Sequence, residues 1–513
     1  MVATLPHSRL CVHRNGQPTR VRRYVMVTGL GPEHNLGVYN NNVSTVERAL
    51  VERYFLCKEG NVYRPALTPL PQVFTRSQFK LFRGLVMEHM PTLPRLSRQQ
   101  VVDRYTGGKR KMYQDALYSL QQEPLTNRDS HLVMFVKFEK QDMTKAPRAI
   151  NPRNRRYNLK LGQYLKHAEK PFLRAINKAY GARTPMTVIK GVNSDVAANV
   201  LRAKWDLFSD PVAVGLDATK FDMHVSLEAL RYEHSFYKAL FPGSKELNTL
   251  LNRQYHNQGR AYVDDGYVDF EMRGKRCSGD LNTSLGNCLL MCSMIHAYAR
   301  TRKVDIELAN NGDDCVVFME RRNLPKFKHN LDSWFRDHGF AMEVEPPCFE
   351  FEQLEFCQTH PVFLSTGWRM VRNHTAVLTK DPMCLIPVTN DRTLRKWLGA
   401  VGECGSILAH GVPVQHQFYN MLYDNGLAST DGFKRQVFKN TTMLAKLGGL
   451  SNNHSIGVTD VARVSYYYAF GVLPDEQREL ERHYDTGYIH TLDVEPIERC
   501  YVQIEPGIIN YGL

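Results

Sequence analysis

The middle of the chain alternates short apolar runs with longer segments of helical spacing, the pattern of a protein that mixes strands and helices. Val212–Leu216 is short and mostly apolar and predicts a buried strand, and a helix is predicted after it over about Ser226–Leu240. Further helices are predicted over about Ser77–Met90, Asp280–Arg300 and Leu324–His338.

A β-hairpin is predicted between the last two of these helices. Apolar and polar residues alternate over 304–308, Asn311-Gly312 has the composition of a tight turn, and Cys315–Phe318 is apolar again. We therefore expect two neighbouring antiparallel strands at this point of the chain.

The two ends of the chain differ in pattern. Short strand-like pieces occur near the beginning, at Tyr24–Val27 and Gly37–Tyr39, and again over about Ala341–Leu378. Beyond Pro382 the pattern is mostly helical to about Tyr484. The expected fold class is therefore α+β, with a helical last quarter.

The segment Lys137–Lys160 is strongly basic, with eight basic residues against two acidic ones. Pro147 and Pro152 interrupt any continuous helix, so we interpret the segment as an arm of strands and loops. The basic residues of this arm are Lys137, Lys140, Lys145, Arg148, Arg153, Arg155, Arg156 and Lys160.

The whole chain is basic as well. Its 513 residues carry 66 Lys and Arg against 52 Asp and Glu, a net charge of +14. This favours a polyanionic partner, nucleic acid first and an anionic membrane surface second, although a basic but inert surface would look the same. The hydrophobic fraction of 43% is enough to fill large cores, which excludes wholesale disorder.

Two other classes of protein are not indicated. The eleven cysteines include no CxxC pair, so we expect neither a zinc site nor a disulfide framework. The expected compartment is a reducing one. The best apolar run, Cys288–Ala299, is shorter than a membrane span. Pro6, His7 and Arg9 interrupt the beginning of the chain, so a signal peptide is not expected.

Four acidic residues are candidates for chemistry. Asp217 ends the predicted strand and Asp222 follows five positions later, while Asp313 and Asp314 lie in the predicted hairpin turn. If the two elements are neighbours in one sheet, these carboxylates converge, and such hard oxygen ligands suit Mg²⁺. The alternative is that Asn-Gly-Asp-Asp is only good turn chemistry.

A third element lies between the two acidic ones. Ser278 and Gly279 form a loop, and Thr283 and Asn287, four positions apart, share one helical face. These groups could bind a sugar and the template backbone. Ser278 could instead be a simple helix cap, but Leu281 occupies the position where a capping box would need Glu or Gln.

The order of these elements resembles the RNA-dependent RNA polymerases of positive-strand RNA viruses. The basic arm comes first, then the spaced aspartates, then the Ser-Gly loop, then Gly-Asp-Asp. The surrounding sequence is similar to that of the plant tombusvirus family. The passages that carry this similarity are Phe135–Lys140, Ala146–Arg153, Leu354–Gln358 and Tyr467–Asp475.

The resemblance implies roles for individual residues. It implies that Asp217 and Asp313 bind metal, Mg²⁺ or Mn²⁺, supported by Asp314. The residues that would bind the nucleotide are Asp222, Ser278, Thr283, Asn287, Lys140, Lys145 and Arg148, the last three alternatively being a solvated basic surface. The residues that would contact RNA are Lys137, Arg153, Arg155, Arg156 and Gly279.

The resemblance also implies a right-hand polymerase with fingers, an antiparallel palm sheet with helices, and a helical thumb. The expected divisions are fingers over 1–210, palm over 211–350 with a fingers insertion at about 225–275, a palm–thumb hairpin over 351–381, and thumb and tail over 382–513. Leu354–Gln358 would support the nascent strand. The region Gly339–Pro346 offers no lysine for the leaving pyrophosphate, so that role is unassigned.

Two other classes are weighed against this reading. A reverse transcriptase would share the aspartates but more usually has an aromatic residue where this chain has Gly312, and it would lack the Asp222, Ser278 and Asn287 set. A non-catalytic RNA-binding replication factor would explain the charge alone. It has no need for aspartates at strand ends.

The resemblance implies partners and a location as well. The expected partners are template and nascent RNA, nucleoside triphosphates, a viral auxiliary replication protein and host factors. Members of such families are usually made as longer readthrough or frameshift products whose upstream part reaches host membranes. We therefore expect indirect membrane association, in replication complexes of the host cytoplasm.

Overall fold

A four-stranded antiparallel sheet carries the predicted aspartates. The computed structural model describes residues 2–5, 8–60, 62–439, 443, 447, 450 and 456–489. In spatial order the strands of this sheet are β14 (Glu307–Asn311), β15 (Asp314–Glu320), β11 (Pro211–Ala218) and β16 (Met342–Val344). The predicted buried strand and the predicted hairpin are both confirmed.

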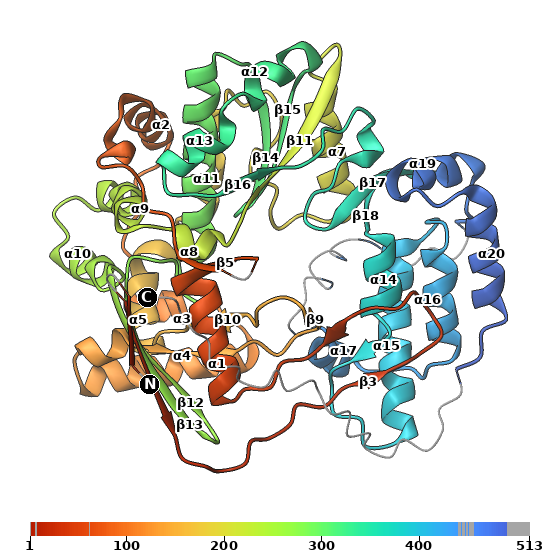
Figure 1. The fold of residues 1–513 in the computed structure, drawn as a ribbon, viewed down its shortest axis with the longest axis horizontal. Helices are drawn as coiled ribbons and strands as arrows, with labels where there is room; N and C mark the ends of the chain where they lie inside the picture. Colours follow the sequence, from red (N-terminus) through yellow and green to blue (C-terminus); the bar gives the residue numbers. More distant parts are fainter. Residues whose placement is uncertain are drawn as a thin grey trace.

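Both faces of this sheet are buried. Val212 and Val214 on β11 belong to the largest apolar core, which also contains much of α11 (Thr283–Arg302). Ala213, between them, faces a second core with Leu201 of α7 (Ser194–Trp205). Figure 1 shows α11 and α7 on opposite sides of the sheet. Because α11 is buried on almost every side, the predicted helix over about 280–300 is a core helix.

Shorter helices complete this lobe. Near the end of β11 lie α8 (Phe221–His224) and α9 (Leu227–Leu240), the second of which confirms a predicted helix and begins with Ser226 as its N-cap. The single helix predicted over 324–338 is wrong. The chain forms α12 (Leu324–Lys328) and α13 (Leu331–Asp337), because Asn330 between them has a left-handed φ of 57°.

A five-stranded sheet, which the sequence patterns did not predict, joins the beginning of the chain to its middle. Here β2 pairs with β13 although more than 250 residues separate them. The strands in spatial order are β1 (Val2–Leu5), β2 (Ser8–Arg14), β13 (Gly266–Arg273), β12 (His256–Val263) and β7 (Leu132–Val133).

Further helices lie near this second sheet, at the left of Figure 1, and a short hairpin lies beside α8 near the centre. They are α1 (Val43–Leu50), the π-helical turn Val51–Phe55, β5 (Leu56–Glu59), β6 (Val62–Pro65), α3 (Arg98–Val102), α4 (Gly107–Gln122), α5 (Arg155–Leu165) and α10 (Lys245–Asn252). Two more, α2 (Ser77–Glu88) and α6 (Glu169–Ala179), pack with α11 in the largest core. The prediction of α2 is confirmed.

The basic arm is built from short strand pairs. β8 (Phe135–Val136) pairs with β10 (Ala149–Ile150), and β9 (Gln141–Asp142) pairs with β4 (Leu36–Gly37). The interpretation as strands and loops holds to residue 150. Its last part is wrong, because α5 begins at Arg155, where the Asn154 side chain caps the helix by accepting from the backbone N–H of Arg156 at 2.9 Å.

A helical lobe follows, at the right of Figure 1. Its hairpin is β17 (Thr359–Leu364) and β18 (Gly367–Arg372), and its helices are α14 (His374–Lys380), α15 (Asp391–Ala409), α16 (Gln415–Asp424), α17 (Asp431–Val437), α19 (Asp460–Phe470) and α20 (Pro474–Asp485). Helix α14 replaces the strand expected up to Leu378. Of the tail predicted after about Tyr484, residues 490–513 lie outside the described residues.

The beginning of the chain crosses to this helical lobe. β3 (Val25–Met26) pairs with β19 (Met383–Cys384), and the hydroxyl of Tyr484 donates to the carbonyl of Leu30 at 2.7 Å. Over the described residues, no helix combines the length and apolar character needed to cross a membrane.

Candidate active site

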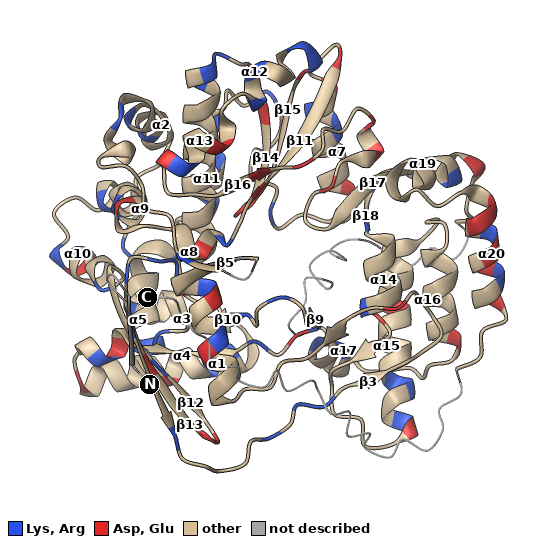
Figure 2. Cartoon of the chain, viewed as in Figure 1, with Lys and Arg blue, Asp and Glu red and all other residues tan. Residues whose placement is uncertain are grey.

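Three of the predicted aspartates lie at one end of the four-stranded sheet, where Figure 2 shows acidic positions in red. The antiparallel register makes Asp217 the Cα partner of Asp314. A two-residue turn, Gly312-Asp313, joins β14 to β15, and Gly312 has φ +76°, which suits glycine. The side-chain amide of Asn310 donates to the carbonyl of Gly312 at 2.7 Å. The predicted meeting of the two acidic elements at one sheet edge is confirmed.

Burial and the charge of neighbouring carboxylates raise the pKa values of these aspartates. Desolvation raises the pKa of Asp217, and the charges of Asp313 and Glu343 raise it further. Desolvation likewise raises the pKa of Asp314 to about 6, with further upward contributions from Asp313 and Asp217. Negative charge is therefore concentrated here, and a cation would relieve the repulsion.

A strained turn holds Asp314. The backbone N–H of Cys357 donates to Oδ2 of Asp314 at 2.7 Å. Cys357 and Gln358 have φ values of 52° and 58°, left-handed conformations that cost roughly 1 kcal/mol or more for residues other than glycine. The motif passage Leu354–Gln358 thus lies against the aspartates and fixes the direction of one of them.

The carboxylates have the chemistry of a divalent-metal site, although their side chains do not form a complete ligand cluster in this structure. Among the described residues, no three Asp, Glu, His or Cys side chains form a group that could already hold a metal ion. The register nevertheless brings Asp217 and Asp314 opposite each other with Asp313 adjacent. Carboxylate oxygens in such an arrangement are the ligands that Mg²⁺ and Mn²⁺ prefer.

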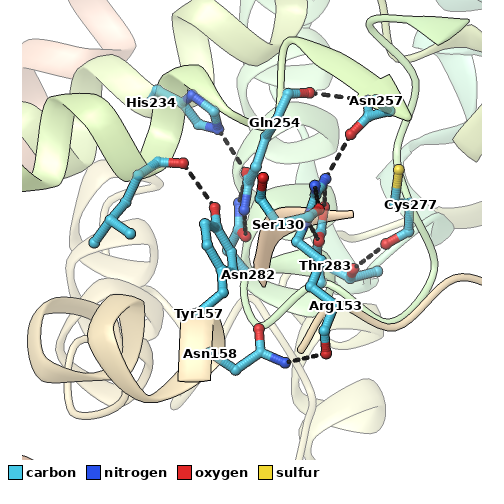
Figure 3. Close-up of polar contacts among 12 residues, drawn as sticks. Ser130, Arg153, Tyr157, Asn158, His234, Gln254, Asn257, Cys277, Asn282 and Thr283 are labelled. Carbon is cyan, nitrogen blue, oxygen red and sulfur yellow. Dashed lines mark hydrogen bonds and ion pairs between the residues drawn. The ribbon is translucent and has the colours of Figure 1, made fainter. Parts of the chain in front are cut away.

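The predicted sugar-binding residues meet one another. The Ser278 hydroxyl donates to Oδ2 of Asp222, and the Asn287 amide donates to Oδ1 of the same carboxylate at 3.4 Å. The Thr283 hydroxyl donates instead to the carbonyl of Cys277 at 3.0 Å, which pins the loop to the start of α11 (Figure 3). Gly279 has φ +124°, and a Cβ there would lie 3.0 Å from the backbone of Asn151, so the loop closely approaches the arm.

Two residues of the basic arm reach this site. Arg148 is exposed, with 57% of its side chain accessible. Burial raises the pKa of both Asp222 and Asp313, and the positive charge of Arg148 opposes this rise in each. The charge of Lys145 acts on Asp217 in the same direction. Figure 2 shows basic positions in blue along the segment between β10 and β9. The charges of Lys145 and Arg148 therefore lie within electrostatic reach of the aspartates.

Lys140 faces elsewhere, which contradicts its predicted contact with a nucleotide. Its Nζ donates to the carbonyl of Lys380 at the end of α14, at 2.5 Å. Burial lowers the pKa of Lys140 to about 8, against an upward contribution from the charge of Asp381. Spacing along the sequence could not reveal this, because neighbouring arm residues point to different lobes.

Arg153 was predicted to contact RNA, and this is wrong. Its side chain is 1% exposed and is paired with Asp280 at 2.5 Å. It also donates to the Asn257 side chain at 2.6 Å and to the Ser130 carbonyl at 2.7 Å (Figure 3). A guanidinium so enclosed holds the loop and the arm together and has no surface left for a ligand.

The other predicted RNA contacts differ in accessibility. Arg156 is mostly buried, pairing with Asp129 at 3.0 Å and donating to the Ser119 hydroxyl at 2.6 Å, so its predicted contact with RNA is not supported. Arg155 is exposed. Lys137 is partly exposed and pairs with Glu139 at 2.7 Å.

A buried polar network, which the sequence did not reveal, lies behind the predicted sugar-binding residues. The side-chain amides of Gln254 and Asn282 bind each other at 2.9 and 3.2 Å, and His234 contacts Gln254 at 3.0 Å (Figure 3). Arg276 and Glu233, both fully buried, form an ion pair beside it. Isolated polar residues in buried segments have no periodicity, so no sequence pattern could have found them.

Comparison with known proteins gives consistent matches. A family profile described as viral RNA dependent RNA polymerase matches residues 10–491. The RNA-directed RNA polymerase of Tobacco necrosis virus (strain A) is 39% identical over 97% of this chain and 68% of its own length. Those of Cymbidium ringspot virus and Tomato bushy stunt virus (strain Cherry) are 42% and 41% identical, over 97% and 93% of this chain. The chain spans only 60% and 58% of the lengths of these last two relatives.

Proposed function

Because the chain belongs to the family of viral RNA-dependent RNA polymerases, we propose that it copies RNA by template-directed nucleotidyl transfer. In this reaction an RNA 3′-hydroxyl attacks the α-phosphate of a nucleoside triphosphate and releases pyrophosphate. The observation that carries the proposal is the pairing of Asp217 with Asp314 beside the Gly312-Asp313 turn, with Asp222, Ser278 and Asn287 joined nearby.

We propose that the three lobes are the parts of a right hand. The four-stranded sheet with its helices corresponds to the palm, and the five-stranded sheet with the basic arm corresponds to the fingers. The helices from α15 onward correspond to the thumb. Supporting this assignment, the insertion at about 225–275 contains β12 and β13, which pair with the N-terminal strands.

Asp217 and Asp313 would hold the divalent ions, with Asp314 supporting them. When bound, such ions lower the pKa of the attacking hydroxyl and stabilise negative charge on the leaving oxygen. The N–H of Cys357 keeps one oxygen of Asp314 directed toward the palm–thumb turn.

The arm and the loop would bind the nucleotide between them. Arg148 and Lys145 are exposed cations near the carboxylates, so they suit the triphosphate. Asp222, Ser278 and Asn287 suit the ribose, because a 2′-hydroxyl can both donate and accept a hydrogen bond. Exposed Arg155 suits the RNA backbone.

The wider setting is also a proposal. The relatives are named for the same activity in plant viruses, and the chain spans only part of their length. We propose that it works with template and nascent RNA, with a viral auxiliary protein and with host factors. Its place would be a membrane-associated replication complex in the host cytoplasm, reached through such partners.

A synthesis assay tests the proposed reaction. The purified chain is given a heteropolymeric RNA template, labelled ribonucleotides and no primer, with and without chelator, and product length is measured on a gel. Template-length RNA should form only without chelator. Asp313→Ala should reduce synthesis below about 1% of wild type, because losing a metal ligand removes several kcal/mol of transition-state stabilisation.

The matched control is Asp305→Ala, since the Asp305 side chain is 70% exposed on the same lobe. It should retain near wild-type synthesis, and both variants should bind RNA as the wild type does. Equal synthesis by Asp313→Ala and the wild type would exclude the assigned catalytic centre. Preference for deoxynucleotides would point to a reverse transcriptase instead.

A further inference from the structure

A buried ion pair lies directly behind the proposed ribose site. Nη2 of Arg276 donates to Oε2 of Glu233, and both side chains are completely enclosed. Arg276 lies two positions before Ser278 in the loop, whereas Glu233 lies on α9. The pair therefore connects the loop to a helix that contributes no other residue to the site.

The guanidinium also fixes the direction of Asn287. Nε of Arg276 donates to the amide oxygen of Asn287 at 2.8 Å. A carboxamide accepts at one end and donates at the other, so this bond turns the donating nitrogen of Asn287 toward Asp222. The backbone N–H of Arg276 additionally donates to the carbonyl of Asp222 at 2.9 Å. Arg276 thus touches two of the three residues assigned to the ribose.

Glu233 is held in turn from its other side. Its Oε1 accepts from the Tyr237 hydroxyl and from the Asn282 amide, each at 2.8 Å. Oε2 of the same carboxylate faces Arg276. The carboxylate therefore has a defined orientation, and its ion pair with Arg276 fixes the orientation of the guanidinium.

The helix makes room for this pair at one position. A Cβ on Gly286 of α11 would lie 2.3 Å from Oε1 of Glu233 and 2.5 Å from Nη2 of Arg276. Any side chain there would displace the ion pair. Glycine within a helix costs about 1 kcal/mol relative to alanine, so α11 is intrinsically less stable at Gly286, where it contacts the ion pair.

Stability of the fold alone does not explain the pair. Burying two charges costs free energy, and apolar residues of similar volume are often as stabilising or more so. Among the described residues, Nη1 of Arg276 is buried without a hydrogen-bond partner, which adds to this cost. What the pair supplies is a fixed orientation of the donors around it.

We propose that Arg276 and Glu233 are positioning residues for ribose recognition, which set the amide of Asn287 so that its nitrogen, beside Asp222, faces the 2′-hydroxyl of the incoming nucleotide. This inference rests on the proposed function and deepens it. Without the pair, the amide of Asn287 is free to rotate and discrimination between ribose and deoxyribose falls. Neither residue contacts the nucleotide itself.

The test is the ratio of kcat/KM for GTP to that for dGTP on one RNA template. Glu233→Gln and Arg276→Lys should each lower this ratio about tenfold, the effect of losing one well-placed hydrogen bond. The loss should fall on GTP, with kcat/KM for dGTP nearly unchanged. The matched control is Glu307→Gln, since Glu307 is an equally buried carboxylate paired with Lys204 at 3.0 Å, and its ratio should remain at the wild-type value.

A double variant separates positioning from general loosening of the fold. In the Asn287→Ala background, Glu233→Gln should change the ratio no further, because both substitutions act through one amide. Should Glu233→Gln and Arg276→Lys fail to fold, Tyr237→Phe removes one donor to Glu233 at little structural cost. It should lower the ratio in the same direction by a smaller factor.

Three results would overturn the inference: an unchanged ratio in the folded variants, an equal fall in Glu307→Gln, or a full further fall in the Asn287→Ala background. Failure of the proposed function is a different result, because the wild type itself would then incorporate no ribonucleotide.

Discussion

At the scale of single residues, Arg148 and Arg155 occur seven positions apart but have different surroundings. Arg148 lies within electrostatic reach of Asp222 and Asp313, whereas Arg155 is the exposed first residue of α5. Arg148→Ala should raise KM for nucleotides several-fold and lower kcat, because in the proposed role its charge would serve both docking and the transition state. Steady-state kinetics with varied nucleotide concentration measures this.

Arg155→Ala is the matched control for that measurement. It should leave both kinetic constants for the nucleotide unchanged and weaken RNA binding, lowering the salt dependence of the affinity by about one counterion. If Arg148→Ala altered only the salt dependence, Arg148 would belong with the template contacts.

The sequence predicted the positions of the strand-end carboxylates better than it predicted the surroundings of the basic residues. Asp217, Asp313 and Asp314 could be placed because strand ends and a tight turn bring carboxylates to a sheet edge. Lys140 and Arg153 could not, because a basic residue looks the same in sequence whether it faces solvent, another lobe or the interior. Burial is decided by packing between distant segments, which spacing does not show.

At the scale of elements, the arm and α14 meet through Lys140. Burial lowers the pKa of Lys140 to about 8, below the ordinary 10.5. Between these two values the unfolded chain holds a proton that the folded chain lacks, so this group makes the free energy of unfolding rise with pH there. Lys140→Met should remove that rise.

The measurement is the thermal unfolding midpoint of wild type and Lys140→Met at several values between pH 7.5 and pH 10. The difference in midpoint should grow in favour of the wild type as pH increases. Lys145→Met, at an exposed position of the same arm, should follow the wild type. Parallel curves for wild type and Lys140→Met would show that the contact is absent in solution.

Elements with local signals could be predicted, and elements defined by distant partners could not. β11 and the β14–β15 hairpin follow from apolar runs and turn residues. β2 has no such signal, because its partner β13 lies far along the chain. The division of α12 from α13 rests on the left-handed conformation of Asn330, which composition alone does not require.

At the scale of the whole molecule, several histidines are packed inside the protein in neutral form. Burial lowers the pKa of each to about 4, from an ordinary 6.5. They are His224, His234, His296 and His338. Between these values the unfolded chain binds more protons than the folded chain, so stability present above pH 6.5 is lost as pH falls toward 4.

His296→Phe tests one of these contributions. His296 packs 5.0 Å from the ring of Phe82 and 5.4 Å from that of Tyr180, so a phenyl ring suits the site. The variant should lose less thermal stability than the wild type between pH 6.5 and pH 4.5, as measured by the unfolding midpoint. His131→Phe, at an exposed position, should not change this loss.

The pairing of β2 with β13 also bears on the order of events during synthesis. Arg9 pairs with Glu271, which a ribosome adds 262 residues later. At about 5–20 residues per second, β2 waits roughly ten to fifty seconds before its partner exists. During that interval the backbone groups of β2 that bond to β13 in the finished fold have no native partner, and the apolar side chain of Leu10 lacks its final cover. β2 is therefore open to aggregation until β13 has been synthesised, and we expect chaperones to act on this segment during that interval.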